Sequence, residues 1–329
     1  MANFLAYFDL LGYKKFIENN SEEHLDRRTN HFGRNIEMAL ALDHPNIPSK
    51  RPGIAISDIS HSTLNCLTFS DTVILWTNSN TLQDFEEILR VAYKYNNFNI
   101  MHDFPSRGCL VYGDIWYKPF DSESLRGGKY MLNMIYGKAL IDAHLRAEAM
   151  NWAGCELDKS AIEYAKTLGD INPLLTEYTM VYDIPFKAKD DKEITLSGHA
   201  LRLSHGRILI TEHYENGIKS AFTQDNKGKI EGRTKVIFDN TIKFLNAHKI
   251  TFPFYYRMSS SKGLTQSFGK LEANYNHTII NEVQNGEKIS YSQEITKFDL
   301  DTSNRDFLVA EEIKMEVFDE QLQKVQKLN

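Results

Sequence analysis

The stretch Phe4-Leu-Ala-Tyr-Phe-Asp9-Leu-Leu-Gly12 decides how this chain is interpreted. Its apolar and aromatic run predicts a β-strand, Gly12 predicts a tight turn, and a helical pattern containing Phe16 begins after the turn. The stretch Leu67-Thr-Phe-Ser-Asp-Thr-Val-Ile-Leu-Trp76 predicts a further strand or hairpin, because β-branched and aromatic residues favour strands. Each of these two segments contains an aspartate, Asp9 and Asp71.

These two aspartates stand in apolar surroundings, where a lone ionised carboxylate costs several kcal/mol. Two carboxylates paired across a sheet are natural ligands for Mg²⁺ or Mn²⁺, hard cations that prefer oxygen and keep open positions for phosphates. The separation of Asp9 and Asp71 leaves room for a helix and an insertion between neighbouring strands. For each aspartate taken singly, the alternative is a helix N-cap or a turn residue.

The rest of the first half predicts further elements in a regular order. A loop or insertion is expected at residues 43–65, and Leu82, Phe85, Leu89 and Ala92 recur at helical spacing. A strand is expected at residues 107–112, a polar flexible loop at 122–129, a helix after Gly137 and a short strand at 155–158. The resulting order, β-α-loop-β(β)-α-β-loop-α-β, predicts an α+β fold. It is compatible with a ferredoxin-like mixed or antiparallel sheet that helices cover on one face.

The second half is expected to be an α/β extension, so we place a core at residues 1–160 and the extension at 161–329. Short strand-like runs occur at 178–182, 200–203 and 208–211, and a helical pattern covers 236–245. A final helix is expected to contain Met315, Val317, Phe318 and Leu322.

Composition limits the function classes. The 329 residues carry 38 basic and 44 acidic side chains, a formal net charge of −6, which argues against binding to polymeric nucleic acid. Cys66, Cys109 and Cys155 are odd in number and widely spaced, which fits a reducing cytoplasm better than a disulfide framework. No apolar run reaches the length of a membrane span and no signal peptide is visible, so we expect a cytoplasmic protein without a membrane contact.

Four motifs, in order over residues 4–158, resemble the class III nucleotidyl cyclases. They are Phe8-Asp9-Leu10-Leu11-Gly12-Tyr13, Phe69-Ser70-Asp71-Thr72, Arg107-Gly108 with Gly113, and Tyr136-Gly137-Lys138-Ala139-Leu140. The sequences of these motifs look most like those of the pyrimidine cyclases of Pycsar antiphage systems. Tyr182–Lys187 and the helix around Phe238–Phe244 also resemble segments of that group. The resemblance implies an enzyme that converts UTP to 3′,5′-cyclic UMP and pyrophosphate upon phage infection, and a separate effector that binds the product.

Other functions remain open beside this one. They are a cytidylate cyclase, then an adenylate or guanylate cyclase, and then a degenerate cyclase fold that binds a nucleotide without turnover. Leu67 stands where adenylate cyclases have a purine-selecting lysine, which argues against adenine. The side-chain amides of Asn65 or Asn133 could bind either uracil or cytosine, so the sequence leaves the base open.

The resemblance also implies roles for individual residues. Asp9, Asp71 and the carbonyl of Leu10 would bind two divalent metal ions, Mn²⁺ or Mg²⁺. The turn Leu11-Gly12-Tyr13 would present backbone N–H groups to the triphosphate at a helix N-terminus.

Three further residues are candidate phosphate ligands: Arg107, Arg126 and Lys129. The alternative for Arg107 is an ion pair at a strand edge. The alternative for Arg126 and Lys129 is a solvated loop.

The sequence departs from the family on the helix after Gly137. Ile141 and Leu145 occupy the positions where the family has an Asn and an Arg. Arg146 lies one position later and is our candidate transition-state arginine, although a helix turns about 100° per residue and the substitution would need a shift in register. The resemblance further implies a head-to-tail homodimer in which one protomer binds the metals and the other supplies the base pocket and the helix contacts.

Overall fold

The computed structural model describes residues 2–44, 47–48, 55–187, 193–203 and 211–248, and the backbone of four strands beyond them. The chain divides into two compact units. The first comprises Met1–Arg202 and Gly217–Ile242, and the second comprises Leu203–Asn216 and Lys243–Asn329.

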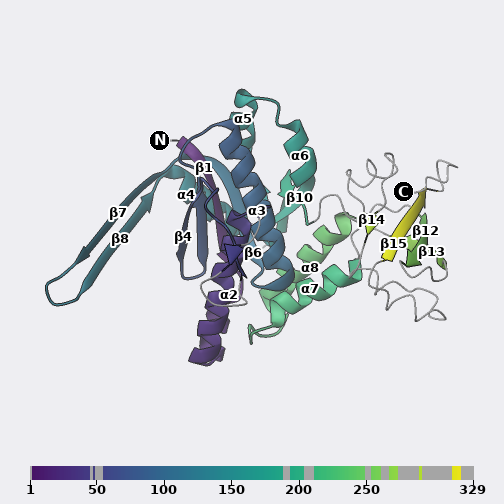
Figure 1. Ribbon diagram of the computed structural model, residues 1–329, viewed down its shortest axis with the longest axis horizontal. Helices are drawn as coiled ribbons and strands as arrows, with labels where there is room; N and C mark the ends of the chain where they lie inside the picture. Colours follow the sequence, from purple (N-terminus) through teal and green to yellow (C-terminus); the bar gives the residue numbers. More distant parts are fainter. Residues whose placement is uncertain are drawn as a thin grey trace. The chain divides into compact units, whose positions relative to one another are not determined.

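A seven-stranded sheet forms the centre of the first unit, in the order β10-β11-β9-β6-β1-β5-β4 (Figure 1). Every neighbouring pair is antiparallel except β6 and β9, which run parallel. The predicted α+β class with a mixed, mostly antiparallel sheet is therefore confirmed. The strands are β1 (Ala2–Leu10), β4 (Asn65–Phe69), β5 (Thr72–Trp76), β6 (Ser106–Asp114), β9 (Gly154–Leu157), β10 (Thr179–Lys187) and β11 (Glu193–Leu201).

Eight helices are described, together with a small ladder of β2 (Ile47–Pro48) and β3 (Ala55–Ile56). The helix after Gly137 and the helix that contains residues 236–245 are where the sequence predicts them. The helices are α1 (Tyr13–Asn19), α2 (Glu22–Leu40), α3 (Leu82–His102), α4 (Lys138–Ala149), α5 (Lys159–Leu168), α6 (Asn172–Tyr178), α7 (Thr211–Thr223) and α8 (Gly232–Ala247).

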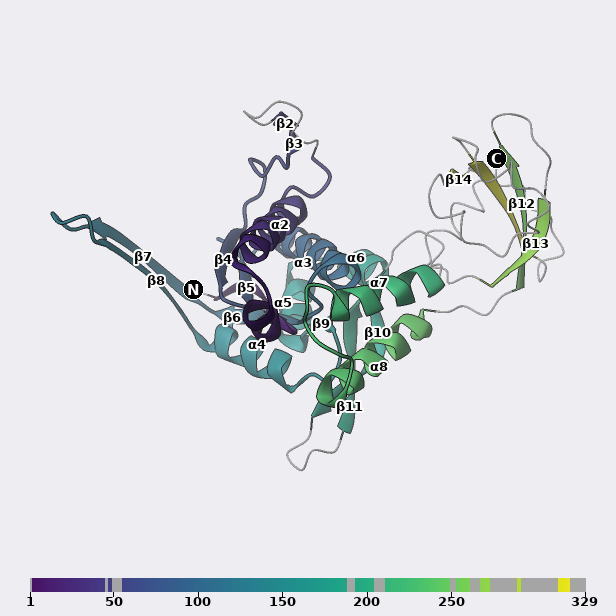
Figure 2. The same cartoon turned by 90° about the horizontal axis from the view of Figure 1, so that it is seen from below.

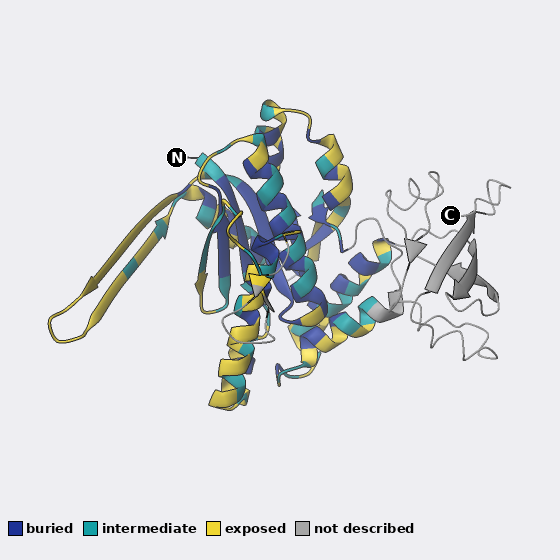
Figure 3. Cartoon of the chain, viewed as in Figure 1, coloured by how far each residue is buried: buried dark blue, intermediate teal, exposed yellow. Residues whose placement is uncertain are grey.

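The helices cover both faces of the sheet, whereas the sequence predicts cover on one face. Alternate residues of β1, among them Phe4 and Phe8, are buried in a core shared with α2, α3 and α5. The intervening residue Tyr7 points to the other face, where its hydroxyl lies 2.9 Å from Nδ1 of His144 on α4. Figure 2 shows α4 on the opposite side of the sheet from α2 and α3, and Figure 3 shows the buried strands between them.

A long hairpin projects from this unit, where the sequence predicts a polar loop over residues 122–129. It consists of β7 (Trp116–Glu123) and β8 (Lys129–Tyr136), both largely exposed (Figure 3). The turn itself is shorter than predicted: the Ser124 N–H donates to the Gly128 carbonyl, and Gly127 has a φ of 79°. Cross-strand aromatic pairs hold the strands together, such as Trp116 stacked on Tyr136 at 5.6 Å.

The predicted boundary at residue 160 lies inside the first unit, because β10 and β11 belong to the same sheet as β1. The runs at 178–182 and 200–203 overlap these two strands, as predicted, whereas residues 208–210 lie outside the described residues.

The second unit contains a sheet in the order β13-β12-β15-β14. Its strands are β12 (Pro253–Ser260), β13 (Ser267–Glu272), β14 (Ile289–Ser290) and β15 (Ile313–Asp319). The helix predicted to contain Met315, Val317 and Phe318 is wrong, because these residues lie in β15. The apolar residues Ile313, Met315 and Val317 alternate with polar ones, which is the period of a strand. Leu322 lies outside the described residues.

Two further observations concern the described part of the chain. None of its helices combines the length and the apolar character that crossing a membrane requires. Cys66, Cys109 and Cys155 are all unpaired, as their spacing predicts.

Candidate active site

The structure brings Asp9 and Asp71 together at the end of β1. Ser70 and Asp71 form the two-residue turn between β4 and β5, and Ser70 has a φ of 54°. In the β1–β5 register Asp9 is opposite Thr72, and the Leu10 N–H donates to the Asp71 carbonyl at 2.8 Å. The hairpin turn therefore places the second aspartate beside the first.

Asp9 forms an ion pair with Arg107, its partner in the β1–β6 register. The guanidinium donates to Oδ2 of Asp9 and, through its other terminal nitrogen, to the Glu148 carbonyl at 2.9 Å. Arg107 is buried, so the structure shows the strand ion pair that was its alternative role. A cation placed this way orients the Asp9 carboxylate instead of standing free for a phosphate.

Burial dominates the electrostatics of Asp9. It raises the pKa of the Asp9 carboxyl above its ordinary value, the positive charge and hydrogen bond of Arg107 oppose that rise, and the nearby charge of Asp71 adds to it. Asp71 also raises the pKa of Tyr13, after burial, so the phenol of Tyr13 lies within its field. The site thus has two interacting carboxylates with one compensating arginine.

These residues fit a divalent cation of the Mg²⁺ or Mn²⁺ kind. The predicted donors are all oxygens, two carboxylates and the carbonyl of Leu10, which hard cations prefer. A cation would relieve both the cost of burying Asp9 and its repulsion from Asp71. Within the described ranges no group of three or more His, Cys, Asp or Glu side chains could hold a metal by itself, so water or substrate oxygens would complete the coordination.

The turn after β1 offers fewer N–H groups than the sequence predicts. Gly12 has a φ of 82° and its carbonyl accepts the Phe16 N–H at 3.0 Å, so α1 begins here. The Leu11 N–H donates to the Pro105 carbonyl at 2.8 Å and is already used. The N–H groups of Gly12 and Tyr13 have no acceptor among the described residues, and they remain as the donors for an anion.

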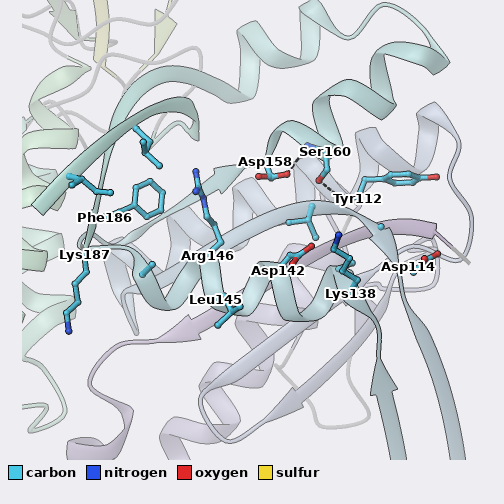
Figure 4. A pocket seen from close by; sticks show the side chains of 16 residues that line it. Tyr112, Asp114, Lys138, Asp142, Leu145, Arg146, Asp158, Ser160, Phe186 and Lys187 are labelled. Atoms are coloured by element: carbon cyan, nitrogen blue, oxygen red, sulfur yellow. Dashed lines mark hydrogen bonds between the residues drawn. The ribbon is translucent and has the colours of Figure 1, made fainter. Parts of the chain in front are cut away.

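Arg146 has a different partner from the one predicted. Its Nε and a terminal nitrogen donate to the two carboxylate oxygens of buried Glu156 at 2.6 and 2.7 Å, and its guanidinium lies 4.2 Å from the Phe186 ring centre. Arg146 and Phe186 line a pocket of about 690 Å³ beside α4 (Figure 4). On α4 it is His144 that contacts β1, so the structure does not bring Arg146 to Asp9 and Asp71 in the same protomer.

The remaining predicted ligands also lie apart from Asp9. Arg126 and Lys129 are at the tip of the β7–β8 hairpin, which extends away from the sheet (Figure 1). The Asn65 side chain donates to Asn78 Oδ1 at 2.8 Å, and Asn133 Oδ1 accepts the Tyr117 hydroxyl at 2.8 Å. A role for these residues at the site would require a second copy of the chain.

Sequence reasoning missed two contributors to the site, Tyr7 and Lys227. Tyr7 lies two residues before Asp9 and therefore on the same face of β1, a signal that was present. Lys227 packs against Gly12 from a loop far along the chain, and no motif marks it.

The sequence matches no protein-family model and no curated protein. Three solved structures with a similar arrangement are a guanylate cyclase domain, an adenylyl cyclase and a second guanylyl cyclase domain. The guanylate cyclase domain of RhGC from Catenaria anguillulae, in complex with GTP, is 11% identical over 61% of this chain and 95% of that chain, with a TM-score of 0.38.

A bacterial light-regulated adenylyl cyclase is 8% identical over 67% of this chain and 57% of that chain, with a TM-score of 0.39. The dimeric guanylyl cyclase domain of the RhoGC fusion protein from the aquatic fungus Blastocladiella emersonii is 11% identical over 61% and 93%, with a TM-score of 0.37. Because these similarities are low, the function of this chain has to be argued from its own residues.

Proposed function

We propose that this chain is a class III-like nucleotidyl cyclase that converts UTP to 3′,5′-cyclic UMP and pyrophosphate. One observation carries the proposal: the β4–β5 turn places Asp71 beside Asp9 at the end of β1, directly before the Gly12 turn. The four motifs that resemble this family support it, since two of them contain these aspartates. A cyclic UMP product would be the second messenger of an antiphage response and would act on a separate effector.

Each residue has a definite part in this chemistry. Asp9 and Asp71 would hold the divalent cations, and Arg107 keeps the Asp9 carboxylate ionised and oriented. A bound cation supplies Lewis-acid chemistry, which favours loss of the ribose 3′-OH proton and the departure of pyrophosphate. The free N–H groups of Gly12 and Tyr13 bind phosphate oxygens at the start of α1.

The choice of base rests on the position of Leu67. This side chain is opposite Ile74 in the β4–β5 register, on the strand that leads to Asp71, and it cannot donate a hydrogen bond to adenine. We therefore favour a pyrimidine, with UTP ahead of CTP. Adenylate or guanylate cyclase activity, or nucleotide binding without turnover, would be found by the same assay.

A homodimer completes the proposed site. Ile141 and Leu145, four residues apart and therefore on one face of α4, are 58% and 57% exposed. Large apolar side chains gathered on one face of a protein mark an interface. We place the partner's α4 against this face, and the hairpin tips with Arg126 and Lys129 are our candidates for further phosphate ligands in the dimer.

The test is incubation of the purified protein with each of the four nucleoside triphosphates and Mn²⁺, followed by mass identification of the products. We expect cyclic UMP from UTP. Asp9→Asn and Asp71→Asn should each lower the rate by at least about a hundredfold, because each removes a charged metal ligand. Asp183→Asn, an exposed aspartate on β10, is the matched control and should be as active as the unchanged protein. Absence of a cyclic product from all four nucleotides would exclude the proposal.

A further inference from the structure

The loop between α7 and α8 packs against the segment that follows Asp9. The Asn19 side chain donates to the Asn226 carbonyl at 2.9 Å, and the Asn20 side chain donates to the Asp225 carbonyl at 2.7 Å. On the other side of the loop, the Gln224 side chain donates to the carbonyls of His102 and Asp103 at 2.8 and 3.0 Å. The loop is thereby fixed between the end of α1 and the end of α3.

Side chains also hold the loop in an uncommon backbone conformation. Asp225 and Asn226 have φ values of 58° and 55°, in the left-handed region that Asp and Asn adopt more readily than other non-glycine residues. The Asp225 carboxylate accepts from Nε2 of His24 at 3.0 Å and from Arg28 at 2.9 Å, both on α2. These contacts hold the loop against α2 immediately before Lys227.

That next side chain is Lys227, which is buried beneath the Gly12 turn. Its Nζ donates to the Asp103 carbonyl at 2.6 Å and lies 3.9 Å from the Phe104 ring centre. A Cβ on Gly12 would be 3.3 Å from the aliphatic carbons of Lys227, so these carbons support the turn from below. The following residue, Pro105, accepts the Leu11 N–H. Lys227 thus contacts both the Gly12 turn and the 103–105 segment to which that turn is hydrogen-bonded.

A charged lysine at this place has an energetic cost, although the carboxylates of Asp225 and Asp103 offset part of it. Burial lowers the pKa of Lys227 to about 8, so keeping its ammonium charged opposes folding at neutral pH. A methionine of similar length would fill the same space without that cost, but it would remove a positive charge that favours the ionised form of buried Asp103. The ammonium does provide a donor at the Asp103 carbonyl, and this contact fixes the 103–105 segment against which Leu11 is hydrogen-bonded.

We propose that Lys227 is a positioning residue: it holds the Leu11-Gly12-Tyr13 turn in the conformation that binds the triphosphate. This inference rests on the proposed function and adds to it a contribution from the second half of the chain. Lys227 acts on the substrate only through the turn. Its loss should weaken nucleotide binding more than it slows the chemical step.

The experiment compares Lys227→Met, Lys227→Arg and Lys229→Met with the unchanged protein. Lys227→Met keeps the aliphatic carbons and removes the donor, whereas Lys227→Arg keeps a donor and a cation over Phe104. Lys229→Met is the matched control, because Lys229 is exposed in the same loop. For each protein we measure KM and kcat for UTP and the amide hydrogen exchange of the peptides that cover residues 9–16 and 102–106.

Lys227→Met should raise KM about tenfold with a smaller change in kcat, as expected for a small displacement of a binding group. It should also speed exchange in both peptides, and Lys227→Arg should restore most of both properties. A merely structural role would lower the folded fraction, and hence apparent kcat, and would leave KM unchanged. An unchanged KM with unchanged exchange, or an equal effect of Lys229→Met, would overturn the inference. If the unchanged protein has no cyclase activity but Lys227→Met still speeds amide exchange in both peptides, the proposed function fails and the coupling of Lys227 to the turn is upheld.

Discussion

Asp9 and Arg107 form a cross-strand ion pair in which the guanidinium favours the ionised form of the Asp9 carboxylate. Because burial raises the pKa of Asp9 and Arg107 opposes that rise, Arg107→Met should raise this pKa further. Metal binding needs the ionised carboxylate, so the acid limb of kcat/KM against pH should move to higher pH. Arg107→Lys retains the charge and should move the limb less. An acid limb that stays in place in Arg107→Met would show that Arg107 does not act on Asp9.

Arg146 and Glu156 form the other strong ion pair near α4, in a place where the carboxylate is buried. Arg146→Met leaves that carboxylate without a partner and should lower the free energy of unfolding by about 3 kcal/mol in urea titrations. Adding Glu156→Gln should recover part of the loss, since the uncompensated charge is removed. Equal stability of Arg146→Met and the unchanged protein would contradict the structural role that this geometry indicates.

The start of α3 shows how local chemistry fixes a helix boundary. The Thr81 hydroxyl accepts the Asp84 N–H at 3.2 Å, and the Asp84 carboxylate accepts the Thr81 N–H at 2.8 Å, which is a capping box. Thr81→Ala should reduce the free energy of unfolding by about 1 kcal/mol. Thr195→Ala, an exposed threonine on β11 outside any cap, should change it much less. Equal effects of the two substitutions would contradict the capping assignment.

Elements with one dominant local signal could be predicted from the sequence, and elements with mixed signals could not. The strands β1 and β5 are almost continuous apolar runs, so their local strand propensity and their burial in the core favour the same structure. The arms of the β7–β8 hairpin contain Pro119 and polar residues, so they look like a loop until Trp116 and Tyr136 are seen to stack. In β15 the alternation of apolar and polar residues was present, but its apolar content also suits a helix.

The residues of the candidate site, which come from distant parts of the chain, likewise fall into those that the sequence could predict and those that it could not. Asp9 and Asp71 could be predicted because each lies in a distinctive apolar segment and a hairpin turn suffices to join them. Arg146 was predicted as catalytic, but its partner Glu156 is set by the path of β9, which no sequence motif indicates. Lys227 could not be predicted, because its contact with the Gly12 turn depends on how α7 and α8 return to the sheet.

A homodimer makes a prediction for the intact protein. If the partner covers the exposed face of α4, specific activity should rise with protein concentration as dimers form. Leu145→Glu should weaken the dimer in sedimentation experiments and lower activity at a given concentration, because a carboxylate would be buried in the interface. Val181→Glu is the matched control, since Val181 is 65% exposed on the edge strand β10. A concentration-independent activity would contradict a site shared between protomers.

The packing of the α7–α8 loop against α1 also has a consequence for protein synthesis. Asn19 and Asn226, which are hydrogen-bonded, are 207 residues apart. At about 5–20 residues per second, a ribosome needs roughly ten to forty seconds to add that length of chain. Once Asp71 has been added, the nascent polypeptide has both aspartates for the rest of this interval but lacks Lys227 beneath Gly12, so a chain released early would lack a completed turn. The proposed cyclase activity would therefore begin only after most of the protein has been made.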